Sequence, residues 1–156
     1  MKELVEELQS WFIKNGMTLS TAESCTGGNI AHEITKISGS SNYFLGSVVS
    51  YANTVKQNVL KVSVSDIAKW GVVSEPVARQ MAVGVQEIIG SSYSISTTGV
   101  AGPAGGAEEN PVGTVWIGIA GPGFQVVEKY VFEGNRLSII KKATKQALIS
   151  LRAVCK

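Results

Sequence analysis

Segments with helical periodicity alternate with short strand-like runs along almost the whole chain of 156 residues. This alternation restricts the chain to layered α/β folds. A hairpin of the last two strands makes the expected sheet mixed, and the length fits a single domain over residues 1–156. Apolar spacing predicts helices over 4–14, 28–37, 55–61, 77–89 and 137–154, and composition predicts strands over 17–22, 44–52, 93–98, 114–120 and 125–132. The helix over 77–89 is expected to start with a hydroxyl cap at Ser74 and an early proline.

Charge and cysteine content exclude several classes of protein. A net charge of +2 with 17% charged residues gives no electrostatic footprint for nucleic acid, so no nucleic-acid partner is expected. No apolar run approaches the roughly 20 residues that span a bilayer, and the acidic, amphipathic start is unlike a signal peptide, so we expect a cytoplasmic protein without membrane contact. Two cysteines and one histidine make neither a disulfide framework nor a zinc site, so we expect chemistry without a metal or cofactor.

The run Thr21–Gly28 places hydroxyls, a thiol and glycines between a predicted strand and a predicted helix. Glycine lets the backbone approach a ligand closely, and the first amides of a helix point outward without partners. Amides near Thr26, Gly27 and Gly28 could therefore hold an oxyanion or a phosphate, and the sequence leaves both open. The alternative is a simple helix cap made by hydroxyl side chains.

A second constellation lies in the segment Ser47–Lys56. Period-two alternation puts Ser47, Val49, Tyr51 and Asn53 on one face of the strand, so Tyr51 and Asn53 are expected to point the same way. Lys56 lies about one helical turn past the strand end and can reach back over the tyrosine if the chain turns there. A desolvated lysine loses its proton more readily and can act as a general base. The alternative is an edge tyrosine with a solvated lysine.

A long glycine-rich loop follows the strand predicted over 93–98 and extends to Gly113. Ligands of open α/β sheets gather beyond the carboxyl ends of strands, so this loop and the Ser24 turn share one crevice if their strands are parallel neighbours. The loop matches neither a Walker A motif nor a dinucleotide fingerprint.

Six ordered blocks resemble the CinA C-terminal domain family over nearly the whole chain. The resemblance implies a three-layer α/β/α sandwich, a homo-oligomer, commonly a dimer, and hydrolysis of a small mononucleotide substrate. In that reaction nicotinamide mononucleotide yields nicotinic acid mononucleotide and ammonia. Many relatives carry an additional N-terminal domain, and no activity of that domain is expected here. The blocks are 22–28, 38–41, 51–56, 71–76, 99–103 and 111–115, of which the first reads Ala-Glu-Ser-Cys-Thr-Gly-Gly.

The resemblance also implies roles for individual residues. Ser24 is the nucleophile, with Tyr51 and Lys56 as its acid/base partners. An amide is a poor electrophile with a poor leaving group, so the serine must lose a proton and the departing nitrogen must gain one. The implied substrate-binding set is Thr26, Gly27, Gly28, Asn53, Thr98, Gly99, Gly102 and Arg136, with Arg136 meeting either a phosphate or only a helix start.

Two further readings stay open at the level of sequence. Cys25 is the rival nucleophile, but His32, about 10 Å further along one helix, is out of its reach. A nonenzymatic module could instead bind a nucleotide or a partner protein through the same crevice. Relatives often carry other residues at Ala52, Thr54, Ala104 and Ala107, which makes contacts from the glycine-rich loop harder to transfer.

Overall fold

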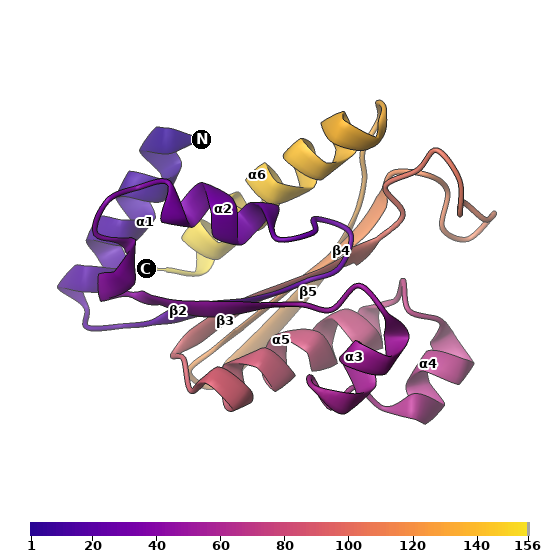
Figure 1. Cartoon of the computed structure of the whole chain (residues 1–156), viewed down its shortest axis with the longest axis horizontal. Helices are drawn as coiled ribbons and strands as arrows, with labels where there is room; N and C mark the ends of the chain where they lie inside the picture. Colours follow the sequence, from indigo (N-terminus) through magenta and orange to yellow (C-terminus); the bar gives the residue numbers. More distant parts are fainter. Residues whose placement is uncertain (156) are drawn as a thin grey trace.

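The chain folds around one five-stranded sheet with helices on both faces (Figure 1). The computed structural model describes residues 1–155. The strands are β1 (Leu19–Glu23), β2 (Phe44–Val49), β3 (Tyr93–Gly99), β4 (Thr114–Gly121) and β5 (Phe124–Val131). The helices are α1 (Lys2–Lys14), α2 (Asn29–Thr35), α3 (Asn53–Asn58), α4 (Val64–Trp70), α5 (Glu75–Ile89) and α6 (Arg136–Val154), with a short 3-10 turn at Ser40–Asn42.

The strand order β2-β1-β3-β4-β5 confirms the expected mixed sheet. β1 pairs with β2 and β3 in parallel, whereas β3–β4 and β4–β5 are antiparallel. Every residue of β1 is buried, which is typical of a strand covered on both faces. The carboxyl ends of β1, β2 and β3 therefore meet at one edge of the sheet.

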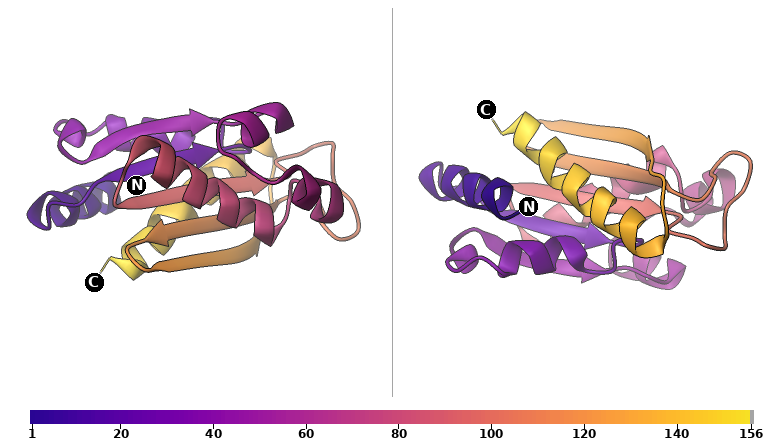
Figure 2. Two further views of the ribbon diagram at one scale, coloured as in Figure 1. Left: turned by 90° about the horizontal axis from the view of Figure 1, so that it is seen from below. Right: turned by 90° about the horizontal axis from the view of Figure 1, so that it is seen from above.

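The three-layer sandwich is confirmed as well. Helices α1, α2 and α6 cover one face and α3, α4 and α5 the other, as the views from above and below show (Figures 1 and 2). Apolar side chains of α1, α2 and α6 share the larger core with β3 and β4, including Leu8, Ile34 and Leu148. A smaller core with Met81 and Val85 joins α5 to the other face.

Three local predictions are wrong. The strand expected to reach residue 52 ends at Val49, because the chain turns there and Asn53 begins α3. α4 was not predicted; its cap is Ser63, whose hydroxyl accepts a hydrogen bond from the Asp66 amide at 3.2 Å. The expected hydroxyl cap at Ser74 is absent, because that hydroxyl donates to the Gly71 carbonyl oxygen at 2.8 Å instead.

Candidate active site

The ends of three parallel strands converge on the predicted nucleophile. The Ser24 N–H donates to the Thr97 carbonyl at 3.0 Å, and the Ser50 N–H donates to the Glu23 carbonyl at 2.9 Å. These bonds continue the strand pairing one residue past β1 and β2, so the turn after each strand is held against its neighbour. The expected shared crevice is present because β1 and β3 are parallel neighbours.

Ser24 and Lys56 form the central pair of this site. The Lys56 Nζ lies 3.0 Å from the Ser24 Oγ and donates to the Ser50 carbonyl oxygen at 2.7 Å. Lys56 lies in the short helix α3 and is only 2% exposed. The side chain thus reaches back from α3 to the strand ends, and the Ser50 carbonyl fixes the position of its amine.

Burial lowers the pKa of Lys56 below its ordinary value, and the neighbouring Cys25 opposes this in part. A lower pKa increases the fraction of neutral amine near physiological pH. A neutral amine at 3.0 Å from a serine oxygen has the distance and the lone pair that proton removal requires. The pair can therefore activate Ser24 as a nucleophile.

Glu23 organises the turn that carries Ser24. Its carboxylate is fully buried and accepts hydrogen bonds from the amides of Gly28, Ile30 and Ala31 at 2.9–3.1 Å. It also accepts from the Thr26 hydroxyl at 2.6 Å. The negative charge thus occupies the N-terminus of α2, which is where a helix dipole favours an anion.

The hydrogen bonds within this turn leave only some of its backbone amides available to a ligand. The Gly28 amide is bound to Glu23, and the Gly27 amide donates to the Ser24 carbonyl at 3.0 Å. Both glycine amides were expected to face a ligand, but each already has an acceptor. Among residues 1–155, no protein oxygen accepts from the amides of Cys25 and Thr26. These two amides directly follow Ser24 in the chain, and Cys25 lines the pocket, so they are the candidates for stabilising an oxyanion.

A pocket of about 310 Å³ opens beside Ser24. The Arg136 side chain crosses its rim, where it donates to the Tyr51 hydroxyl oxygen at 2.6 Å and to the Gly102 carbonyl at 2.7 Å. Tyr51 is 62% exposed, and within residues 1–155 its hydroxyl has no hydrogen bond to Ser24 or Lys56. The pocket is lined by Ser24, Cys25, Tyr51, Val73, Gly99, Val100, Ala101, Gly102, Ala104, Gly105 and Arg136.

Other residues of the predicted substrate-binding set lie elsewhere. The Thr98 hydroxyl donates to the Val72 carbonyl at 2.7 Å and is buried away from the pocket lining. Asn53 is exposed at the start of α3 and does not line the pocket. The Thr26 hydroxyl contacts Glu23 and, at 2.7 Å, the Thr97 hydroxyl. The side chains of Thr98 and Thr26 therefore hold the framework together. Only the backbone groups of these two residues remain as candidates for ligand contact.

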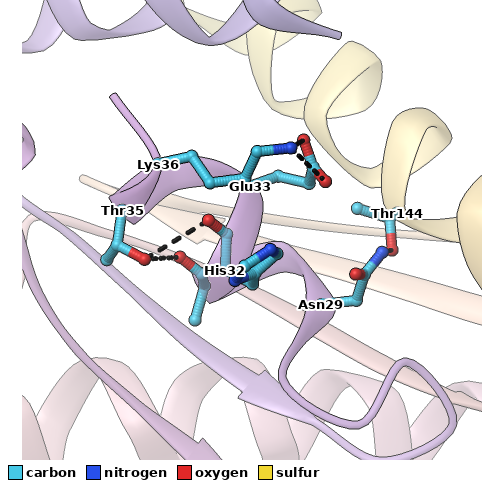
Figure 3. A network of polar contacts seen from close by, with 7 residues as sticks. Asn29, His32, Glu33, Thr35, Lys36 and Thr144 are labelled. Carbon is cyan, nitrogen blue, oxygen red and sulfur yellow. Dashed lines mark hydrogen bonds and ion pairs between the residues drawn. The ribbon is translucent and has the colours of Figure 1, made fainter. Parts of the chain in front are cut away.

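The rival nucleophile Cys25 is buried, at 8% exposure, and burial raises the pKa of its thiol to about 12. At neutral pH the group is therefore a thiol and not a reactive thiolate. His32 lies on α2 (Figure 3). It is exposed and does not line the pocket. Within residues 1–155 the Lys56 Nζ has a hydrogen bond with the Ser24 Oγ and none with the Cys25 thiol, so the base is placed for the serine.

Sequence reasoning missed two groups that shape this site. The Ser50 carbonyl orients Lys56, and Asn110 donates to the Val73 carbonyl at 3.1 Å, which ties the glycine-rich loop to the segment before α5. A backbone carbonyl carries no signal in the sequence, and a single asparagine in a long loop carries little. Within residues 1–155, no three His, Cys, Asp or Glu side chains gather as a metal site, and no helix is long and apolar enough to cross a membrane.

Fold and site together define an α/β protein with a serine–lysine pair at the carboxyl edge of its sheet, the serine of which lines a pocket. The chain belongs to the CinA C-terminal domain family, whose model matches residues 1–155. This membership confirms the resemblance found in the sequence.

Relatives and solved structures agree with that family. A CinA-like protein of Nostoc sp. (strain PCC 7120) is 46% identical over 142 residues, which are 90% of this chain and 34% of that relative. A CinA-like protein of Gloeothece citriformis is 56% identical over 109 residues, 70% of this chain and 26% of that relative. The chain thus spans about a quarter to a third of the length of these curated relatives. The crystal structure of the competence/damage inducible protein CihA from Agrobacterium tumefaciens matches with a TM-score of 0.97 at 34% identity, over 99% of this chain and 95% of that chain.

Proposed function

We propose that this chain is an amidohydrolase that converts nicotinamide mononucleotide to nicotinic acid mononucleotide and ammonia. The observation that carries the proposal is the 3.0 Å approach of the Lys56 Nζ to the Ser24 Oγ, with the lysine buried and its pKa lowered. A serine that attacks an amide needs such a base, because its hydroxyl is a weak nucleophile while protonated.

In the proposed mechanism, neutral Lys56 takes the Ser24 proton while the Ser24 Oγ attacks the carboxamide carbon. The amides of Cys25 and Thr26 stabilise the negative charge that develops on the carboxamide oxygen, at about 3 kcal/mol for a well-placed donor. Protonated Lys56 then returns its proton to the departing nitrogen, and ammonia leaves an acyl-serine. Water, activated by the same lysine, hydrolyses that ester and restores Ser24.

Arg136 supplies the proposed phosphate contact at the rim, where its guanidinium also holds the Tyr51 hydroxyl. A guanidinium binds phosphate through two parallel N–H groups, and Arg136 now uses its donors on Gly102 and the Tyr51 hydroxyl. A phosphate that replaces the hydroxyl on Arg136 frees Tyr51, which then becomes available as the second acid/base partner of the serine. The resemblance assigns this role to Tyr51, and its exposed side chain leaves room for the movement.

The test is ammonia release from nicotinamide mononucleotide by the purified protein, with product identified by chromatography. We expect Ser24→Ala to abolish turnover and Lys56→Met to lower it by about 10²–10⁴-fold, the typical contribution of a general acid/base. Cys25→Ala is the matched control in the same turn and keeps most of the activity. An inactive Cys25→Ala beside an active Ser24→Ala would move the nucleophile to the thiol.

A nonenzymatic nucleotide-binding module is the second candidate. It is supported by the Tyr51 hydroxyl, which contacts Arg136 at the rim instead of the serine–lysine pair. The same preparation separates the two functions. Protection of the protein against heat by the mononucleotide, without any turnover, would favour the binding module and make Lys56 a ligand contact.

We also propose a homodimer, a cytoplasmic location for a reaction on a small nucleotide, and no nucleic-acid partner. The dimer is supported by Leu45 and Val49, each 47% exposed on the edge strand β2 that leads to Tyr51. Light scattering after size-exclusion chromatography measures the mass directly, and a Leu45→Glu variant that leaves the mass unchanged would argue against β2 as the contact.

A further inference from the structure

A second pocket lies between α2 and α6, and lysines dominate its walls. It has a volume of about 400 Å³ and shares no lining residue with the pocket beside Ser24. Lys36 is the residue that caps the C-terminus of α2, whereas Lys141, Lys142 and Lys145 come from α6. The two helices pack against each other, so cations from two separate elements face one concave space.

Few negative groups compensate these lysines. Glu33 is the only carboxylate in the lining, and it is already paired with Lys36 at 3.2 Å (Figure 3). Lys142 donates at 2.5 Å to the carbonyl oxygen of Glu133, which carries no charge. Among residues 1–155, Lys141 and Lys145 have neither an ion pair nor a hydrogen bond to the protein. Two ammonium groups are thus left for a ligand.

The charge balance sets this pocket apart from the rest of the molecule. Its four lysines and one glutamate carry a net charge of +3, whereas the whole chain carries +2, so the remainder is slightly negative. Helix α6 contains five basic residues and no acidic one. Lys141 and Lys145 are also one turn apart, and like charges at that spacing destabilise a helix unless an anion offsets them.

We propose that the pocket between α2 and α6 binds a short polyphosphate chain, as carried by inorganic tripolyphosphate or a nucleoside triphosphate. Three or four negative charges match the net +3 of the lining, and a single concavity fits a short chain better than a long polymer. The Asn29 side chain, whose amide donates to Thr144 at 2.9 Å, fixes one end of the pocket and keeps α2 against α6 (Figure 3).

The site is distinct from the proposed phosphate contact at Arg136. Lys141 follows Arg136 by five residues, which is about 7.5 Å along the helix axis. Substitution of Arg136 therefore removes the contact at the catalytic pocket and leaves the lysine pocket intact. This separation allows the two anion sites to be tested independently.

The experiment is calorimetric titration of the purified protein with tripolyphosphate at low and at physiological salt. We expect Lys141→Gln/Lys145→Gln to bind at least tenfold more weakly than the unmodified protein, and Arg136→Ala to retain binding in the lysine pocket. Affinity decreases at higher salt because exposed charges are screened over about 8–10 Å. The control Lys14→Gln/Lys69→Gln lowers the net charge equally, at exposed positions outside the pocket, and keeps the affinity.

Glutamine replaces lysine at little cost to a helix and removes a like-charge pair, so the test variant is expected to fold. An equal loss of affinity in the control variant Lys14→Gln/Lys69→Gln would show that net charge alone attracts the anion, and would overturn the proposal. Undiminished binding by Lys141→Gln/Lys145→Gln would also overturn it. A single-stranded oligonucleotide that binds more tightly than tripolyphosphate at equal salt would do so as well, in favour of nucleic acid. A titration with ATP distinguishes a nucleotide from the inorganic chain.

Discussion

Replacement of Glu23 by glutamine tests the physical account of the turn that carries Ser24. In the native protein one carboxylate oxygen accepts from the Thr26 hydroxyl and from the Gly28 and Ile30 amides. The other accepts from the Ala31 amide at 2.9 Å and from the Thr21 hydroxyl at 3.3 Å. Glutamine keeps one acceptor oxygen and replaces the other with an NH₂ group. If the glutamine oxygen accepts from those three donors, the NH₂ group faces the Ala31 N–H, which then loses its acceptor.

The expected loss of stability follows from these contacts. An amide left without an acceptor in a buried position costs about 1–3 kcal/mol. Loss of the negative charge at the N-terminus of α2 lowers the free energy of unfolding by about 1–2 kcal/mol more, because the charge is buried. We therefore expect Glu23→Gln to lower the free energy of unfolding by about 3 kcal/mol, which in a chain of this size corresponds to a decrease in Tm of about 6–12 °C.

The assay is urea unfolding followed by circular dichroism, with amidase activity measured at a temperature where the variant is folded. Glu7→Gln is the matched control, because Glu7 pairs with Arg152 at 3.1 Å while both side chains are about half exposed. Such a pair contributes less than about 1 kcal/mol. A Glu23→Gln variant as stable as Glu7→Gln would refute the reasoning, since the buried carboxylate would then contribute no more than an exposed one.

Three further predictions concern other parts of the molecule. Arg136→Ala should raise the KM for the mononucleotide at least tenfold and leave the KM for the riboside nearly unchanged, as measured by steady-state ammonia release; equal effects on both would remove the phosphate role. Gly84→Ala should destabilise the protein by about 2 kcal/mol in urea unfolding despite the helix preference of alanine, because the new Cβ would lie 2.0 Å from the Leu60 carbonyl oxygen. Burial raises the pKa of Cys25 and Cys155 from 9.0 to about 12, so their contribution to stability is complete below pH 9 and is lost as the pH rises towards 12. A pH series of urea unfolding should therefore show a smaller decrease above pH 9 in Cys25→Ala/Cys155→Ala than in the unmodified protein.

The fold was largely predictable because its main strands and helices follow local sequence patterns of composition, apolar spacing and glycine placement. The valine- and isoleucine-rich runs and the glycine turn at Gly121–Gly123 gave the hairpin of β4 and β5. Gly90 ends α5 in the left-handed conformation, with φ +77, where glycine has no steric cost. In contrast, α4 has seven residues and no clear apolar stripe, so its helix depends on the Ser63 cap and on packing against α5.

The site was predictable only in part, because its geometry depends on where a strand ends. The pattern Ser47, Val49, Tyr51 and Asn53 suggested one continuous face, yet the chain leaves the sheet after Val49. That turn separates Asn53 from the pocket and brings Lys56 back to Ser24. Alternation in the sequence cannot report a turn without a glycine or proline. The sequence did single out Lys56, but the position of its amine beside Ser24 follows only from the three-dimensional structure.

The buried carboxylate at the N-terminus of α2 restricts where this site can bind further negative charge. A helix N-terminus after a glycine turn is a general place for phosphate, but here Glu23 already occupies it with a buried negative charge. A dianionic phosphate at the same place would be repelled by that carboxylate, so the proposed phosphate contact is at Arg136, the cation among the described residues that line the pocket. Within residues 1–155 no protein oxygen accepts from the Cys25 and Thr26 amides, which follow Ser24 in the chain, so these amides are the ones proposed to stabilise the oxyanion. Glu23 therefore acts as a positioning residue that separates the two negative charges of the proposed substrate complex.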